Sequence, residues 1–205
     1  MKSSNLAFAK AHPGESEGRQ PVHTVYGGAQ LFAADSVPKL GAIARRAMDT
    51  YAPDAATLGK AVGISTHPAL ETINSRVREK LEREPLEDFR IDFEDGYGNR
   101  PDAEEDNHAQ VVARELLKGM KDGTLSPFIG MRVKPLNEEL RGRSIRTLDL
   151  VMTALVEGGG IPDRWVVTIP KITIIEQVEY TVAVLRALEK KLGLADGTLK
   201  FEAMV

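Results

Sequence analysis

The stretch DFRIDFEDGYGNR, residues 88–100, places acidic side chains inside a segment whose pattern predicts a buried strand. Side chains alternate across a strand, so the two phenylalanines and Ile91 share one face. Arg90, Asp92 and Glu94 share the other face. The apolar face suits contact with surrounding helices. A buried carboxylate without a partner is costly, so we expect a cation beside the acidic face.

Outward from this stretch, strand-like and helix-like patterns alternate along the chain. β-Prone runs closed by turn residues predict strands at 22–28, 89–95, 127–136, 164–172 and 199–205. Apolar residues at helical spacing predict helices at 36–52, 67–85, 101–123, 143–160 and 174–194. Alternation of this kind favours parallel strands joined by right-handed helical crossovers.

Parallel strands in this order form either an open doubly wound sheet or a closed (β/α)8 barrel. The sequence VYGGAQLF (residues 25–32) after the first strand is not a phosphate-binding glycine turn, which disfavours a nucleotide-binding open sheet. A barrel needs about 250 residues. We therefore predict a partial (β/α)8 barrel over residues 21–205, comprising its first five βα units and truncated before strands 6–8. Residues 1–20 are polar and predict a flexible N-terminal arm.

Composition narrows the class of protein further. The chain has 205 residues, 42% of them hydrophobic, and a net charge of -3, which gives no indication of a nucleic-acid or membrane partner. It has no cysteine, which excludes disulfides, thiolate catalysis and cysteine-ligated zinc. No run of residues has the pattern of a signal peptide or a membrane span, so we expect a cytoplasmic protein.

Charged side chains converge at the predicted carboxyl ends of neighbouring strands, where parallel α/β barrels carry their active sites. Asp92 and Glu94 lie toward the end of one strand, and Asp95 is just beyond it. Arg132 has the matching orientation in the next strand. An arginine in this place can clamp a substrate carboxylate or can close a structural ion network with the acids, and the residues leave both readings open.

Other polar residues have two readings as well. Lys171 follows Pro170 at a strand end, where it either binds an anionic substrate or is solvated. His23 lies in the first predicted strand, where it either faces the substrate or is a satisfied core histidine. The acids at 102–106, among them Glu105, are expected to complement the macrodipole of the helix that they begin.

Four segments resemble strands of the citrate lyase β-subunit and 2-keto-diacid aldolase family. RIDFEDGYGNR (residues 90–100) resembles the family's LDLEDAV strand, and IGMRVKPL (129–136) resembles the VRVN strand, which carries the substrate arginine. VVTIPKI (166–172) resembles the LPKV strand, and KFEAMV (200–205) resembles the strand that precedes the family's ET pair. The four occur in the family's order.

This resemblance implies a (β/α)8 barrel lyase in which Mg2+ or Mn2+ polarises the carbonyl of a 2-oxo acid or acyl-CoA. An enolate then forms as a carbon–carbon bond breaks. By position, Arg132 would bind the substrate with Asp92 and Glu94 as its catalytic neighbours, and Asp95 and Lys171 would line the substrate. His23 is a further substrate-binding candidate, from its place in the first strand.

The metal ligands themselves are not identified in the chain. The resemblance places the family's metal-binding Glu immediately after Val205, with Glu94 and Asp95 close to the metal's water ligands. It also implies a homo-oligomer. Tyr97 departs from the family's pattern and would add a bulky phenol at the rim. Two alternatives stay open: a non-catalytic barrel fragment or scaffold, and a phosphotransferase that handles phosphoenolpyruvate on the same fold.

Overall fold

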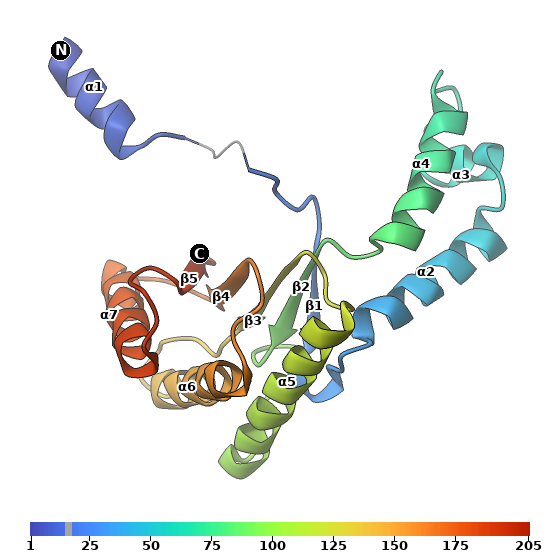
Figure 1. The fold of residues 1–205 in the computed structure, drawn as a ribbon. Helices are drawn as coiled ribbons and strands as arrows, with labels where there is room; N and C mark the ends of the chain where they lie inside the picture. The colour runs from blue at the N-terminus through green and yellow to red at the C-terminus, as the bar shows by residue number, and fades with distance from the viewer. Residues whose placement is uncertain (15–17) are drawn as a thin grey trace.

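The computed structural model describes residues 1–14 and 18–205, and it is an α/β fold built on one parallel sheet (Figure 1). The strands pair in chain order: β1 (Thr24–Gly28), β2 (Asp88–Asp92), β3 (Phe128–Arg132), β4 (Trp165–Ile169) and β5 (Lys200–Ala203). Each described pair is parallel. The predicted alternation of strands and helices is therefore confirmed, with β1 and β5 as the outer strands.

Helices connect the strands and differ in what they contact. The crossovers after β2, β3 and β4 are α5 (Asp102–Asp122), α6 (Arg141–Gly158) and α7 (Ile175–Leu192). A short 3-10 helix, η1 (Ala29–Leu31), follows β1 and is succeeded by α2 (Ser36–Tyr51), α3 (Ala55–Ala61) and α4 (Leu70–Arg83). In Figure 1, α2 to α4 project away from the sheet as a unit. None of the described helices combines the length and apolar character needed to cross a membrane.

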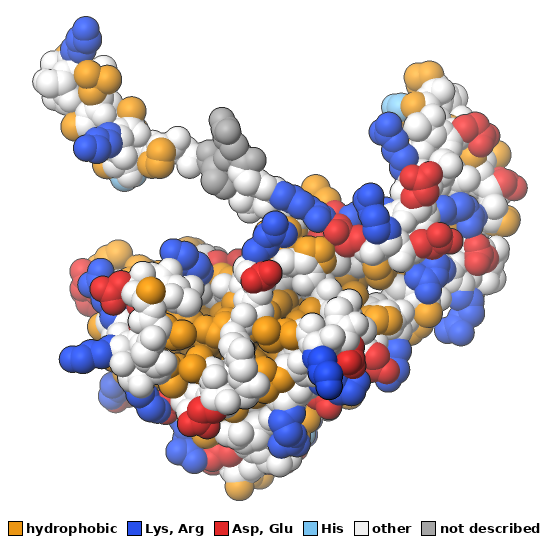
Figure 2. Space-filling view, viewed as in Figure 1, with side chains coloured by type: hydrophobic (Ala, Val, Ile, Leu, Met, Phe, Trp, Pro, Cys, Tyr) orange, Lys and Arg blue, Asp and Glu red, His pale blue; other side chains and the backbone are white. Residues whose placement is uncertain are grey.

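Polar contacts join the helices of the projecting unit. Arg78 of α4 donates to Asp49 of α2 at 2.8 Å and to the carbonyl oxygen of Ala52 at 2.9 Å. On the face shown in Figure 2, Lys and Arg side chains are interspersed with Asp and Glu over α2 and α4. Hydrophobic side chains gather instead at the centre of the main body, between α5 and the α6–α7 pair.

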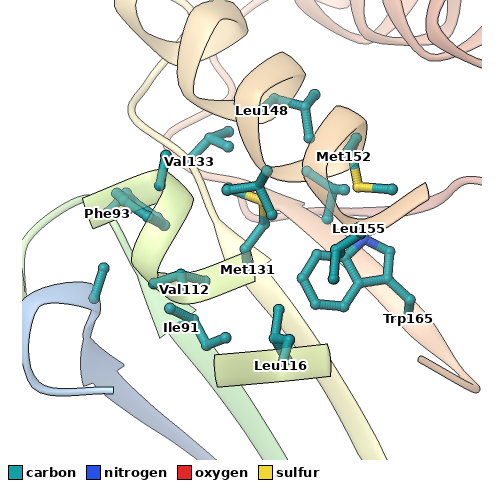
Figure 3. Close-up of a cluster of buried hydrophobic side chains, with 14 of the residues drawn as sticks. Ile91, Phe93, Val112, Leu116, Met131, Val133, Leu148, Met152, Leu155 and Trp165 are labelled. Atoms are coloured by element: carbon teal, nitrogen blue, oxygen red, sulfur yellow. The ribbon is translucent and has the colours of Figure 1, made fainter. Parts of the chain in front are cut away.

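The core lies between the sheet and helices α5 and α6. Ile91 and Met131 are fully buried and pack with Leu116 of α5 and Met152 of α6 (Figure 3). Each large apolar side chain buried in this way contributes about 1.5–3 kcal/mol. The predicted apolar face of β2 is thus confirmed, and its opposite face must take the charged side chains.

That opposite face carries an aligned row of residues across all five strands. The register places Gly28, Asp92, Arg132, Thr168 and Glu202 at one level. Because the strands are parallel, these residues all lie toward the carboxyl ends. The row brings the predicted site residues Asp92 and Arg132 together.

The N-terminal segment contains one helix that the sequence patterns do not predict. Lys2–Ala11 form helix α1, which buries no residue and lies apart from the sheet (Figure 1). That residues 1–20 form a flexible arm stays a prediction. Residues 15–17, which the prediction also covered, lie outside the described residues.

Candidate functional site

Asp92 and Arg132 form the centre of the site. Arg132 Nε donates to Asp92 Oδ1 at 2.8 Å and Arg132 Nη2 donates to Asp92 Oδ2 at 2.6 Å. The two residues are register partners on adjacent strands, and Asp92 is 1% exposed. The prediction that Arg132 lies beside the acidic face of β2 is confirmed, and the pair has the two-point geometry that arginine favours.

The Asp92 carboxylate accepts as many hydrogen bonds as it has acceptor sites. Besides Arg132, it accepts hydrogen bonds from the backbone N–H of Glu94 at 2.9 Å and of Gly96 at 2.7 Å. Burial opposes ionisation of Asp92, but the bonds from Arg132 and these two N–H groups outweigh it and lower its pKa. A carboxylate offers about four acceptor sites. Asp92 therefore orients Arg132 and has little capacity left to take a proton.

The third guanidinium nitrogen of Arg132, Nη1, is not bonded to Asp92. Its Nη1 lies 3.1 Å from Glu94 Oε2 and 3.9 Å from Met204 Sδ. Glu94 Oε2 is buried and makes no hydrogen bond within the described residues. The ring of Tyr26 lies 4.6 Å from the guanidinium carbon of Arg132, an attractive cation–π contact. The guanidinium plane is thus fixed, and Nη1 is the nitrogen that faces an incompletely satisfied carboxylate.

Lys171 closes the rim from the end of β4. Its ammonium contacts the carboxylate of Glu94 and lies 3.0 Å from Asp95 Oδ1. These carboxylates, Glu94 first, raise the pKa of Lys171, and the Lys171 ammonium lowers the pKa of Asp95. Lys171 has a backbone φ of 54°, a left-handed conformation that costs a non-glycine residue about 1–3 kcal/mol. Glu94, Asp95 and Lys171 are therefore brought together as predicted.

His23 does not belong to the site, which corrects the expectation that it binds substrate. β1 begins at Thr24, so His23 precedes the amino end of the strand, and its side chain is exposed. Its Nε2 accepts from the backbone N–H of Glu87 at 3.5 Å. Glu87 itself precedes β2, and the site lies at the other end of both strands.

Tyr97 also lies elsewhere than expected. Its ring is 4% exposed, packs 5.5 Å from the ring of Phe93 and forms a 2.8 Å hydrogen bond with His108 Nδ1. Burial, more than the nearby Glu105 charge, raises its pKa to about 12. The phenol points into the core under α5, so it does not crowd the rim.

A second ion group, not predicted as a site feature, joins Asp88 and Arg90, which lie nearer the amino end of β2, to Glu202 of the aligned row. Arg90 pairs with Asp88 on its own strand and reaches Glu202 on β5, with Nε 3.2 Å from Oε1 and Nη2 3.3 Å from Oε2. Gly130 is the register partner of Arg90 on the intervening strand β3. Alternation in the sequence places Arg90 and Glu202 on the charged face of the sheet, but they lie 112 positions apart, and no local pattern indicates that they pair.

Beside Glu94, Asp95 and Lys171 the surface is hollowed to a volume of about 330 Å³. The polar residues of its lining are Glu94, Asp95, Asn99, Lys134, Asn137 and Lys171. Asn137 Oδ1 is already committed to the backbone N–H of Leu140 at 2.9 Å. Lys134 was not singled out by the sequence; it lies two positions beyond Arg132, after β3 has ended, and its Nζ contacts the carbonyl oxygen of Phe93 and Glu105 of α5.

The carboxylates of the site do not fit a metal centre on their own. Asp92 is saturated, Glu94 and Asp95 are paired with Lys171, and Glu202 is paired with Arg90. Within residues 1–14 and 18–205 there is no group of three acidic or histidine side chains that could hold a metal ion. The Mg2+ or Mn2+ expected from the sequence resemblance therefore has no ligand set among the described residues.

Comparisons with known proteins identify the family of the chain. Among curated proteins and solved structures, none matches the chain significantly. A family described as a domain of unknown function (DUF6986) matches residues 1–205. The match spans the sheet, the projecting α2–α4 unit and every residue of the site. The chain belongs to the DUF6986 family.

Proposed function

We propose that this chain forms the β1–β5 part of a (β/α)8 barrel and is a carbon–carbon lyase that acts on a 2-oxo acid or acyl-CoA through an enolate. The observation that carries the proposal is the uneven pairing of the Arg132 guanidinium. Asp92 bonds two of its nitrogens, and the third, Nη1, points to Glu94. Charged side chains on the inner face at the carboxyl ends of sequential parallel strands support the barrel. The four motif resemblances support the chemistry.

In this proposal Arg132 is the group that binds the substrate oxyanion. A carboxylate or carbonyl oxygen of the substrate takes the place of Glu94 Oε2 at Nη1. A donor held in position before the reaction stabilises the charge that develops on the enolate oxygen without reorganising. Asp92 and the ring of Tyr26 supply that rigidity.

Glu94 is the proposed proton acceptor. Its displaced Oε2 takes the proton of a substrate hydroxyl, the hydroxyl oxygen becomes the carbonyl oxygen of the released aldehyde, and the carbon–carbon bond electrons move into the 2-oxo group as an enolate. Lys171 balances the charge of Glu94 at the rim. The described residues do not fit a metal ion, so the proton transfer is assigned to side chains alone.

Deuterium exchange into the methyl group of pyruvate tests the proposal, measured by proton NMR on the natural protein with and without Mg2+ or Mn2+. We expect exchange faster than with the metal alone. Substitution Arg132→Ala should reduce it by about 10²-fold or more, as loss of an oxyanion donor does. Deuterium exchange no faster than with the metal alone, or an undiminished exchange rate in Arg132→Ala, would contradict the lyase proposal.

The mutual pairing of the site's charges favours a second candidate, a non-catalytic barrel that retains the network for stability. Asp92, Arg132, Glu94 and Lys171 neutralise one another without a ligand. In that case Arg132→Met would lower the free energy of unfolding, and neither pyruvate nor its unreactive analogue oxalate would bind. Calorimetric titration with oxalate separates the two candidates, because the lyase should bind it and Arg132→Met should not.

A further inference from the structure

Lys134 is a buried cation whose contacts serve none of the steps above. It lies two residues beyond Arg132 and is 5% exposed. Its Nζ donates to the carbonyl oxygens of Phe93 at 2.7 Å and Gly98 at 3.3 Å, and it lies 3.1 Å from Glu105 Oε2. Two of its three N–H donors therefore have hydrogen-bond acceptors, and the ammonium also forms an ion pair with Glu105. These contacts join Lys134 to the chain on both sides of Glu94 and to α5.

The two carbonyl groups bracket the connection from β2 to α5. Residues 93–98 carry Glu94 and Asp95, and within them the backbone N–H of Gly98 donates to the carbonyl oxygen of Glu94 at 2.8 Å. Lys134 thus ties both ends of this turn to the end of β3. The place of Glu94 beside Arg132 depends on where the turn is held.

Glu105 connects the same lysine to the helices. Its side chain is fully buried in α5, accepts a hydrogen bond from Thr147 Oγ1 at 2.5 Å, and lies 3.4 Å from Arg143 Nε in α6. Removing Lys134 would consequently leave Glu105 with a second cation. This arrangement allows the role of the lysine in the turn to be separated from the stability of the buried carboxylate.

We propose that Lys134 is a positioning residue, a clamp that holds the 93–98 turn so that Glu94 stays next to Arg132. The clamp rests only on the contacts described above. Its consequence for catalysis rests on the proposed function. The sequence resemblance does not imply this role, because the family's VRVN strand has asparagine where this chain has Lys134.

Two variants isolate the clamp. Glu105→Gln removes the buried negative charge and leaves Lys134 bonded to the two carbonyl groups. The double variant Lys134→Met with Glu105→Gln removes the clamp without leaving a buried charge unpaired. The two variants differ only at position 134, and both lack the Glu105 carboxylate, so their comparison does not include the loss of that charge.

Amide hydrogen exchange, resolved by NMR, is the measurement. Loss of hydrogen bonds from a charged donor should speed exchange at Gly96, Tyr97 and Gly98 by about tenfold or more in the double variant relative to Glu105→Gln. Amides of β4 should exchange alike in both, as the control for the fold. Equal rates at residues 96–98 would overturn the clamp.

The catalytic consequence has its own readout. Arg132 stays fixed by Asp92 in both variants, so KM for pyruvate should be nearly equal, whereas kcat of the exchange reaction should fall about tenfold with the clamp removed. A rise in KM with unchanged kcat would refute this consequence. If the natural protein shows no exchange reaction, the proposed function fails, and the amide comparison still decides whether Lys134 is a clamp.

Discussion

At the scale of single residues, the contacts of Arg132 with Asp92 and Tyr26 determine which of its nitrogens can bind a substrate. Two of its nitrogens are bonded to Asp92, its face lies on Tyr26, and its remaining nitrogen meets Glu94. Lysine would keep the charge but could not make two parallel bonds to one carboxylate. The direction of Arg132 Nη1 therefore depends on the planar shape of the guanidinium group as well as on its charge.

Replacing Asp92 with Asn should destabilise the protein by about 3 kcal/mol at pH 7, because it leaves Arg132 without its buried counter-charge. Urea unfolding of the two proteins measures the difference. Asp95→Asn is the matched control, since its carboxylate is exposed and its pair with Lys171 should contribute less than about 1 kcal/mol. Equal effects of the two substitutions would contradict the central place given to Asp92.

The difference in unfolding free energy between wild type and Asp92→Asn should depend on pH, and the pKa shift of Asp92 determines its sign. The pKa of Asp92 is lowered in the folded protein, so its stabilising contribution is fully present above the ordinary aspartate pKa of about 3.9. It is lost as the pH falls through the lower folded-state pKa, where the carboxyl group takes up a proton. We expect the gap between wild type and Asp92→Asn to be constant from pH 7 to 5 and to shrink below about pH 4. A gap that widens with acid would show the opposite shift.

At the scale of elements, β3 and β4 approach closely because β3 has a glycine at position 130. A Cβ atom at Gly130 would lie 2.0 Å from the carbonyl oxygen of Val166 on β4. That contact is with backbone, so it cannot be relieved by turning a side chain. Gly130 therefore permits the close approach of β3 and β4 beside Arg90, its register partner on β2.

Gly130→Ala should for this reason lower the free energy of unfolding by about 3 kcal/mol, as overpacking of a close contact does. Gly123→Ala is the control: it ends α5 at φ 67°, has open space around a Cβ atom, and should cost only about 1–2 kcal/mol for its conformation. Thermal and urea unfolding of both variants gives the comparison. A smaller effect at Gly130 than at Gly123 would contradict the steric argument.

At the scale of the molecule, the sequence predicts what depends on local periodicity and misses what joins distant segments. The opposite facing of Ile91 and Asp92 follows from the period of a strand, so the two faces of the sheet were predictable. The bond from Arg90 to Glu202 spans 112 positions and has no local signal. Glu105 was read as a helix-dipole residue because its buried partner Lys134 lies on another element. Whether a charge is solvated or buried is decided by packing between elements.

Helix α1 gives the last prediction at this scale. It has 10 residues, buries none of them, and is shorter than the roughly 12–15 residues that an isolated helix needs to be stable in water. Deleting residues 1–14 should therefore change the free energy of unfolding by less than about 0.5 kcal/mol, because Arg19, which bonds Glu84 at 2.9 Å, stays in place. Phe89→Ala, a core change expected to cost about 3–5 kcal/mol, is the control that the urea assay responds. A loss above about 1 kcal/mol on deletion would mean that α1 packs against the protein in solution, and sedimentation would then show whether a second copy supplies that contact.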